Sequence, residues 1–411
     1  MERRVIYLVG VAGNPNYGDE LIARTWLEYL AVHHPNDDVW FDTPHPGPAA
    51  ALLAGLHPRL RVTDTMWRLR DLGEQFGDAR AFVLKALHDP GHAPWWAAGI
   101  DVLRSADIVH IIGGGYLNEL WSSNFAVVAG VGWLAENTGA RTALSGAGLT
   151  PLSDGNRNDL VQDLSAFDVV DVRDIPSALT LADAGDPPLG AQRTADDVFL
   201  SAPYAHIDSA TADLFDVGIV LQDDLVQIDK GALRAFIRAQ VEAWGTPPDR
   251  IAFIECIPRI DASSAQDVGA DWPGAQFYPF QHLWNRGFPA GAHQRWISTR
   301  FHPHLLAARV GARGIAISVH EGYYDTKHRS LVDLGSGWAI VGSDLAQPTS
   351  LSVGTLAERS KGLQYAKEVL ARSIYGLPDQ STSRPPVPTT ASFPTRIRAF
   401  TQQLVPPGLA R

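Results

Sequence analysis

The sequence has few of the features that mark a secreted or membrane-spanning protein. It contains one cysteine, Cys256, in 411 residues, so no disulfide can form within the chain, which suits a reducing compartment. The apolar run at residues 5–11 is too short to cross a membrane and lacks a small-residue cleavage site, and the sequence contains no apolar run long enough to cross one. We therefore expect a cytoplasmic protein, with at most peripheral contact with the inner face of a membrane.

Charge is also scarce, and its balance is acidic. Charged residues make up 19% of the chain, and 34 Lys and Arg against 45 Asp and Glu give a formal net charge of −11. Such a chain does not offer a general basic surface to nucleic acid or to anionic lipid. We expect no nucleic-acid partner, and any site for an anion must be local.

What the sequence does contain is a regular alternation of short apolar runs and helical patterns. The first series of predicted strands covers residues 5–11, 107–112, 141–145 and 169–172. The second series covers residues 217–221, 251–257, 276–278, 297–299, 315–319 and 338–341. Apolar strands that alternate with helices indicate an α/β fold with doubly wound parallel sheets, which bind ligands at the carboxyl ends of their strands.

The length of the chain predicts two domains of roughly 150–200 residues each. We place an N-terminal domain at residues 1–205 and a C-terminal domain at residues 206–376. Residues 377–411 contain a Pro-, Ser- and Thr-rich stretch, and we predict a linker followed by a short closing helix there. Residues 44–94 show little pattern apart from an amphipathic stretch at 64–87, which we predict to be a helix pair.

An arginine and a histidine two residues apart precede a predicted helix in the second series. Arg300 and His302 follow a strand, Pro303 suits the first helical position, and Gly311 ends the pattern. A helix N-terminus favours an anion, Arg300 adds a two-pronged donor, and His302 can move protons near neutral pH. The segment predicts a site for an anionic substrate that must be protonated. The alternatives are a structural salt bridge for Arg300 and a capping or hydrogen-bonding role for His302.

A second candidate site follows the first predicted strand. The loop at residues 13–20 is full of turn residues and carries the polar side chains of Asn16, Asp19 and Glu20. Such groups bind sugar hydroxyls, and Asp19 can also accept a proton from one. The same three residues equally suit a turn and the cap of the following helix.

Two further features give weaker indications. Gly114 lies in a glycine cluster after a strand, where a ligand can approach the backbone, and Asn118 follows just beyond; glycines there also make tight turns. Four histidines could also be considered as metal ligands, but their spacing matches no strong zinc pattern: His302, His304, His320 and His328. We therefore expect no metal site.

Several blocks of the chain resemble, in the same order, motifs of the polysaccharide pyruvyl transferase family. They lie at residues 16–22 (Asn-Tyr-Gly-Asp-Glu-Leu-Ile), 112–115, 146–151, 172–177, 197–199, 299–302 (Thr-Arg-Phe-His) and 327–335. Each block is short, but together they span most of the chain from residue 5 to residue 335. The resemblance implies two Rossmann-like domains facing each other as in GT-B glycosyltransferases, with the acceptor side in the N-terminal domain and the donor side in the C-terminal domain.

The resemblance also implies an activity. Pyruvate would be transferred from phosphoenolpyruvate onto a hydroxyl pair of a sugar, forming a cyclic ketal and releasing phosphate. Phosphoenolpyruvate would be a co-substrate, and no cofactor is expected. The acceptor would be a saccharide in a cell-surface glycan or glycolipid precursor, and it could be free, nucleotide-linked or lipid-linked.

The motifs and the residue chemistry together assign three groups of site residues. The predicted catalytic residues are Asp19, His302 and Lys327. The predicted donor-binding residues are Arg173, Arg300, Phe301, His302 and Lys327. The predicted acceptor-binding residues are Asn16, Asp19, Glu20, Gly114 and Asn118.

Alternatives stay open for these assignments. Arg173 either binds an anion or pairs with Asp171 or Asp174, and Lys327 is otherwise a solvated surface residue. Two other functions also fit the sequence: a GT-B glycosyltransferase that uses a nucleotide-sugar donor, and a non-catalytic sugar- or anion-binding protein on the same fold.

Overall fold

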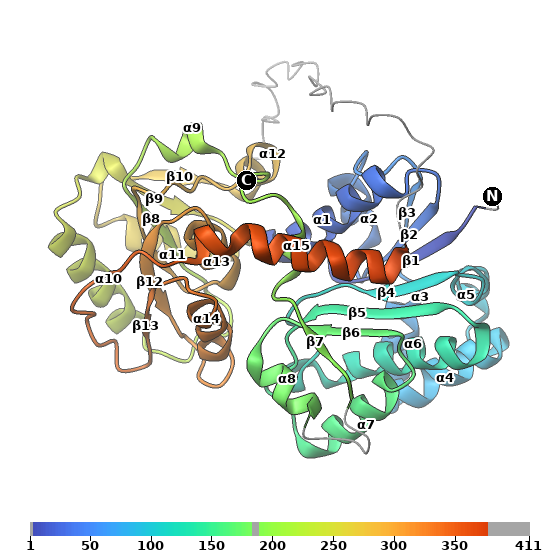
Figure 1. The fold of residues 1–411 in the computed structure, drawn as a ribbon. Helices are drawn as coiled ribbons and strands as arrows, with labels where there is room; N and C mark the ends of the chain where they lie inside the picture. The colour runs from blue at the N-terminus through green and yellow to red at the C-terminus, as the bar shows by residue number, and fades with distance from the viewer. Residues whose placement is uncertain (1–2, 183–188, 377–411) are drawn as a thin grey trace, which may run out of the picture. The chain divides into compact units, whose positions relative to one another are not determined.

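Two parallel sheets form the framework of the protein (Figure 1). A computed structural model describes residues 3–182 and 189–376. From edge to edge, the first sheet contains β3 (Leu60–Thr63), β2 (Asp38–Asp42), β1 (Val5–Val9), β4 (Ile108–Ile111), β5 (Arg141–Ala147), β6 (Val169–Val172) and β7 (Gln192–Arg193). The second contains β10 (Gln276–Tyr278), β9 (Ile251–Ile254), β8 (Val217–Val220), β11 (Arg295–Ser298), β12 (Arg313–Ile317) and β13 (Ala339–Val341).

Both sheets have the strand order of the Rossmann fold. In each sheet the first six strands in chain order lie in the spatial order 3-2-1-4-5-6, and all neighbouring strands are parallel. The predicted fold class is therefore confirmed: α/β, with two Rossmann-like domains in a GT-B-like arrangement. All strands of both predicted series are present, within a few residues at their ends.

Helices connect the strands and cover the sheets. Those of the first part are α1 (Tyr17–His33), α2 (Pro46–Leu52), α3 (Thr65–Gln75), α4 (Ala79–His88), α5 (Ala97–Arg104), α6 (Phe125–Thr138), α7 (Asp154–Leu164) and α8 (Ile175–Ala182). Those of the second part are α9 (Ser209–Ala212), α10 (Lys230–Trp244), α11 (Ile260–Gly269), α12 (Phe280–Arg286), α13 (Phe301–Arg309), α14 (Tyr324–Asp333) and α15 (Leu356–Tyr375). The helix pair predicted at residues 64–87 is confirmed by α3 and α4, which pack against each other.

The two helices that matter most for the site begin earlier than the sequence predicts. Asn16 is the N-cap of α1, and its side chain accepts a hydrogen bond from the backbone of Gly18. In α13 the backbone turns helical directly after Arg300, so Pro303 is the third helical residue and the prediction that it is the first was wrong. Proline is tolerated there because an N–H in the first turn has no acceptor within the helix. His302 therefore lies in the first turn of α13.

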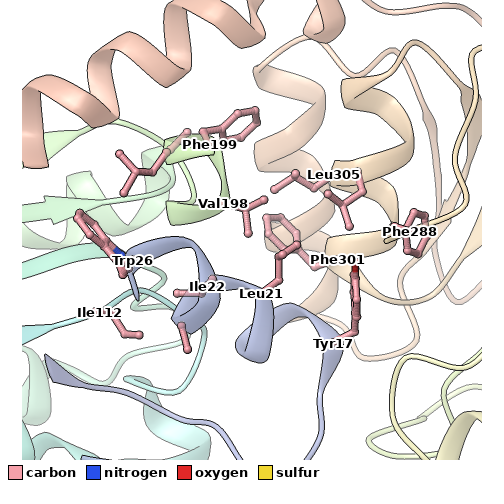
Figure 2. Packing of buried hydrophobic residues seen from close by; sticks show 14 of the residues in the cluster. Tyr17, Leu21, Ile22, Trp26, Ile112, Val198, Phe199, Phe288, Phe301 and Leu305 are labelled. Carbon is pink, nitrogen blue, oxygen red and sulfur yellow. The ribbon is translucent and has the colours of Figure 1, made fainter. Parts of the chain in front are cut away.

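A hydrophobic cluster joins α1 to α13 between the two sheets (Figure 2). Figure 2 shows its central members, which come from α1, from the 3₁₀ helix η4 (Asp197–Leu200), from α13 and from the chain before β11: Tyr17, Leu21, Ile22, Trp26, Val198, Phe199, Phe301, Leu305 and Phe288. These side chains are all buried. The packing holds the N-terminal ends of α1 and α13 near each other, and those ends carry Asp19 and His302.

The last described helix, α15, follows the second sheet in the chain but contacts the first. Its Lys367 is fully buried, and its Nζ lies 2.8 Å from Asp171 Oδ2 and 2.6 Å from Asp197 Oδ1. The hydroxyl of Tyr375, at the end of the same helix, lies 2.5 Å from Nδ1 of His110 on β4. The division at residues 205 and 206 stays a prediction, and the predicted linker and closing helix lie outside the described residues.

Candidate active site

A pocket of about 430 Å³ lies at the carboxyl ends of the strands of the first sheet, opposite the N-terminal ends of α13 and α14. Seven of the predicted site residues line it: Asn16, Asp19, Arg173, Arg300, Phe301, His302 and Lys327. They come from four separate segments of the chain and from both domains. The volume is within the range of ~300–1,000 Å³ that is usual for small-molecule sites.

Asp19 occupies the first turn of α1 at one side of the pocket. The amide of Asn16 donates a hydrogen bond of 2.8 Å to its Oδ2, which fixes the carboxyl group. Burial raises the pKa of Asp19, and three cationic side chains oppose that rise without cancelling it: His302, Lys327 and Arg173. The carboxyl group is thus placed among groups of opposite charge, where it can exchange a proton.

His302 packs directly on the backbone of Gly18. A methyl group at Gly18 would lie 1.8 Å from Nδ1 of the imidazole, so only a glycine leaves room for the ring. On the other side of the ring, Nε2 lies 3.6 Å from Oδ1 of Asp196. Burial raises the pKa of Asp196, but His302, Arg173 and the backbone N–H of Val198 outweigh burial and lower it to about 2. Asp196 is therefore a fixed anion beside the imidazole.

Arg173 follows β6 and has only loose ionic partners. Its Nε lies 3.5 Å from Asp174 and its Nη1 3.6 Å from Asp196, both beyond good hydrogen-bond distance. The guanidinium lies 4.7 Å from the ring centroid of Phe301, and its buried Nε has no hydrogen-bond partner among the described residues. The predicted pairing with Asp174 is thus present, and Arg173 keeps N–H groups for a ligand.

Lys327 is part of the pocket wall and not a solvated surface residue. Its Nζ lies 3.6 Å from the ring centroid of Tyr323, whose hydroxyl donates a hydrogen bond of 3.1 Å to the carbonyl of Gly115. A methyl group at Gly115 would come 2.7 Å from Lys327 Nζ and 3.2 Å from Arg173 Nη2, so the two cations meet over this glycine. Burial, and then the charge of Arg173, hold the pKa of Lys327 well below its ordinary value.

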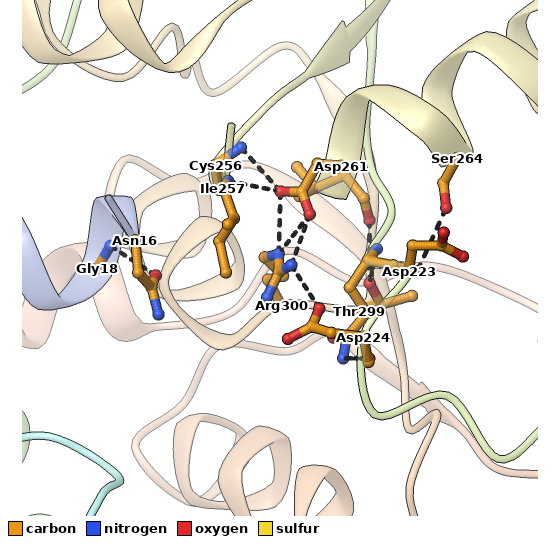
Figure 3. Close-up of polar contacts among 12 residues, drawn as sticks. Asn16, Gly18, Asp223, Asp224, Cys256, Ile257, Asp261, Ser264, Thr299 and Arg300 are labelled. Carbon is orange, nitrogen blue, oxygen red and sulfur yellow. Dashed lines mark hydrogen bonds and ion pairs between the residues drawn. The ribbon is translucent and has the colours of Figure 1, made fainter. Parts of the chain in front are cut away.

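Arg300, in contrast, is bound tightly by two carboxylates (Figure 3). Its Nε lies 2.9 Å from both oxygens of Asp261, and its Nη2 lies 2.5 Å from Asp261 Oδ1 and 2.7 Å from Asp224 Oδ1. Asp261 is itself held by the backbone N–H groups of Cys256 and Ile257. The salt-bridge alternative for Arg300 is therefore present in the structure, and its binding of an anion stays a prediction.

Three predicted acceptor residues are not among those that line the pocket. Glu20 is fully buried, its Oε1 accepts a hydrogen bond from the backbone of Gly13, and burial raises its pKa to about 8. Asn118 caps the 3₁₀ helix η3 (Glu119–Asn124), and its amide also donates to the carbonyl of Gly115. Gly114 has a φ of +147° in the turn after β4. These contacts support the turn and capping alternative for Glu20, Gly114 and Asn118.

Two of the histidines considered as metal ligands, His304 and His328, have other partners. Nδ1 of His304 lies 3.2 Å from Nδ1 of His328, and His304 Nε2 lies 2.9 Å from the hydroxyl of Ser336. Across residues 3–182 and 189–376, no group of three or more His, Cys, Asp or Glu is arranged to hold a metal ion. Over the same residues, no helix is both long and apolar enough to cross a membrane.

Sequence reasoning missed four residues around the pocket: Asp196, Asp224, Asp261 and Tyr323. Asp196 directly precedes the block at residues 197–199, and Asp224 follows a predicted strand, so their positions gave some signal. Asp261 lies 39 residues from its partner Arg300 and carried no such signal. Tyr323 lies four residues before Lys327, which is one helical turn.

Comparisons with solved structures agree with the two-domain architecture. UDP-GlcNAc 2-epimerase from Methanocaldococcus jannaschii aligns with a TM-score of 0.50 and 10% identity over 89% of this chain and 99% of that one. UDP-GlcNAc 2-epimerase from Neisseria meningitidis bound to UDP-GlcNAc aligns with a TM-score of 0.49 and 11% identity over 90% and 99% of the two chains. At such low identity the first likeness speaks for the fold alone.

The family comparison is more specific. No curated protein sequence matches this chain. The family model described as polysaccharide pyruvyl transferase matches residues 16–245, which is more than half of the 411 residues. The matched region contains Asp19 and Arg173 of the pocket and Asp196, which lies beside His302. The chain therefore belongs to the polysaccharide pyruvyl transferase family.

Proposed function

We propose that the protein transfers pyruvate from phosphoenolpyruvate onto a hydroxyl pair of a saccharide, forming a cyclic ketal and releasing phosphate. Family membership implies transfer onto a saccharide. The observation that carries the choice of donor is the convergence of Arg173, Lys327 and His302 in one pocket. Phosphoenolpyruvate carries a phosphate and a carboxylate. Arg173 and Lys327, which meet over Gly115, can bind these two anionic groups, and His302 lies nearby.

The reaction requires a defined set of proton transfers. The oxygen of one sugar hydroxyl bonds to the central carbon of phosphoenolpyruvate, and a proton is added to the methylene carbon, which becomes a methyl group. The second hydroxyl then bonds to the same carbon as the bond to the phosphate oxygen breaks. The two hydroxyl groups release two protons in total. One equals the proton added to the methylene carbon and the other leaves on phosphate, so the overall reaction needs no cofactor.

The residues of the pocket supply these steps. We assign His302 as the acid that protonates the methylene carbon, because imidazole can transfer protons near neutral pH and its Nε2 lies 3.6 Å from the Asp196 carboxylate. We assign Asp19 as the base for a sugar hydroxyl, because it is fixed by Asn16 and adjoins the cations. Arg173 and Lys327 hold the donor and balance the charge of the departing phosphate.

The state of Lys327 supports an anionic ligand in particular. Its lowered pKa means that the empty site stabilises the ammonium group too little against burial and the nearby Arg173. A bound phosphate or carboxylate would supply the missing opposite charge. A lipid linkage of the acceptor and a cytoplasmic location stay predictions.

Product analysis tests this function. The protein is incubated with carbon-labelled phosphoenolpyruvate and a panel of bacterial surface polysaccharides from which pyruvate has been removed by mild acid. The expected result is a ketal methyl signal in the NMR spectrum of one polysaccharide, with an equal amount of inorganic phosphate. His302→Ala should abolish this turnover while phosphoenolpyruvate still binds. Phosphate release without ketal formation would contradict the proposed reaction.

A further inference from the structure

The pocket has a second polar group that the proposed donor chemistry does not use. Asp224 is partly exposed, lines the pocket and is held by Arg300 through a single carboxylate oxygen, Oδ1. Arg300 is in turn held by Asp261 through Nε and Nη2. Figure 3 shows the guanidinium between the two carboxylates. These bonds leave Asp224 Oδ2 and Arg300 Nη1 for a ligand.

The charge of this trio disfavours an anion. Two carboxylates, Asp224 and Asp261, face one guanidinium, so the trio has a formal charge of −1 when all three groups are ionised. Phosphate or carboxylate would be repelled by Asp224 and would find Arg300 already bonded. Arg173 is more available to an anion than Arg300, because its contacts with its carboxylate partners are only loose, at 3.5 and 3.6 Å.

The trio instead matches a hydroxyl group. A hydroxyl both donates and accepts a hydrogen bond, so it pairs with a free carboxylate oxygen beside a guanidinium N–H. The chain of contacts from the backbone of Cys256 through Asp261 and Arg300 fixes the position of Asp224 before any ligand binds. Such a fixed acceptor avoids part of the entropic cost of binding.

The surroundings of Asp224 also suit a sugar. Leu225 and Ile260, which are 40% and 36% exposed, line the same pocket next to Asp224 and Asp261 in the chain. A pyranose has hydroxyl groups at its edge and C–H groups on its faces, so it can meet a carboxylate and an apolar side chain at once. The region combines both kinds of contact.

We propose that Asp224 and Arg300 form a hydroxyl-binding subsite for the saccharide acceptor on the second-domain side of the pocket. This rests on the proposed function for the identity of the acceptor. Asp224 contacts the sugar hydroxyl, and Asp261 acts as a positioning residue through Arg300. The assignment is an alternative to the sequence-based prediction that Arg300 binds the donor, and it adds a second-domain contact to the acceptor residues predicted in the first domain.

The test compares two neighbouring aspartates. Asp224→Asn keeps the size of the side chain but removes its charge. Asp223→Asn is the matched control, because Asp223 has a similar exposure of 32% against 34% and pairs with Lys230 instead of Arg300. The folded full-length protein is titrated with methyl β-D-galactopyranoside, a neutral probe, by saturation-transfer NMR. It is titrated separately with phosphoenolpyruvate by calorimetry.

The expected result is a loss of glycoside affinity of about tenfold or more in Asp224→Asn, as for removal of a charged hydrogen-bond partner. Phosphoenolpyruvate affinity should change less than about twofold, and Asp223→Asn should change neither affinity. Asp224→Ala should repeat the result if the asparagine variant proves unstable.

Three outcomes would overturn the subsite: no glycoside binding to the wild type, equal glycoside binding in Asp224→Asn, or a loss of phosphoenolpyruvate affinity as large as the loss of glycoside affinity. Failure of the proposed function gives a different pattern. The glycoside would then bind in an Asp224-dependent way, while phosphoenolpyruvate would not bind the wild type at all.

Discussion

Replacing Gly18 with alanine would place a methyl group where the imidazole of His302 lies. The new carbon would be 1.8 Å from Nδ1, 2.4 Å from Cγ and 2.5 Å from Cε1 of the ring, and these are its three nearest atoms. Ordinary van der Waals contact begins at about 3.4 Å, so the ring must move by roughly 1.6 Å, the difference from the 1.8 Å contact. All three nearest atoms belong to His302, so His302 is the first side chain that must move.

The displacement has a predictable effect on turnover. A misplacement of about 1 Å in a catalytic group can lower the rate about 100-fold, so Gly18→Ala should lower kcat at least that much. Gly155→Ala is the matched control, because both glycines are the second residue of a helix, after the N-caps Asn16 and Ser153. A methyl group at Gly155 meets nothing within 4 Å. The control should retain full activity.

Unfolding in urea gives a second measurement that needs no substrate. Gly18→Ala should destabilise the wild type, but it should be neutral or stabilise by up to about 1 kcal/mol in a His302→Ala background, since alanine favours a helix. The coupling between the two sites should thus be at least about 1 kcal/mol. Additive effects of the two substitutions on stability, or full activity of Gly18→Ala, would refute the placement of His302 against Gly18.

Three further predictions concern charged groups. An anion should raise the lowered pKa of Lys327, so phosphoenolpyruvate binding should take up protons at any pH close to that pKa; calorimetry over a pH series in buffers of different ionisation enthalpy measures this uptake, and Lys327→Met should remove the part due to Lys327. Lys367→Met should cost about 3–5 kcal/mol of unfolding free energy, as it leaves the carboxylates of Asp171 and Asp197 buried without their cation; a loss below about 1 kcal/mol would contradict this. Burial raises the pKa of Glu20 in the folded protein to about 8 from 4.5. The wild type should therefore lose unfolding free energy relative to Glu20→Gln as pH rises from about 4.5 to 8, by a few kcal/mol at most. If urea unfolding shows the same pH dependence for both proteins, the prediction is contradicted.

The sequence predicted the sheets well where burial is complete. β1, β4, β6, β8 and β9 are apolar runs buried almost throughout, because helices cover both faces. β2, with an aspartate at each end, and the edge strands β3 and β7 lack that signature and were missed. The fold class was predictable because these few buried strands, with helical patterns between them, are enough to indicate an α/β fold.

The site was predictable in its membership and less so in its contacts. Turns after parallel strands must meet at one edge of a sheet, which is why Asp19 and Arg173 lie in one pocket. The partners of a charged side chain depend on residues far away in the chain. Arg300 is bonded to residues 39 and 76 positions earlier, and no local pattern predicts this. The position of Lys327 beside Gly115 and Arg173, which belong to the first domain, likewise depends on the packing of two domains.

The most direct test of the account is a calorimetric titration of the wild type and of Arg173→Met with phosphoenolpyruvate and with UDP-GlcNAc. We expect phosphoenolpyruvate to bind the wild type, its affinity to fall about tenfold or more in Arg173→Met, and UDP-GlcNAc not to bind. Binding of UDP-GlcNAc without binding of phosphoenolpyruvate would contradict the account and would favour a nucleotide-sugar enzyme on the same fold.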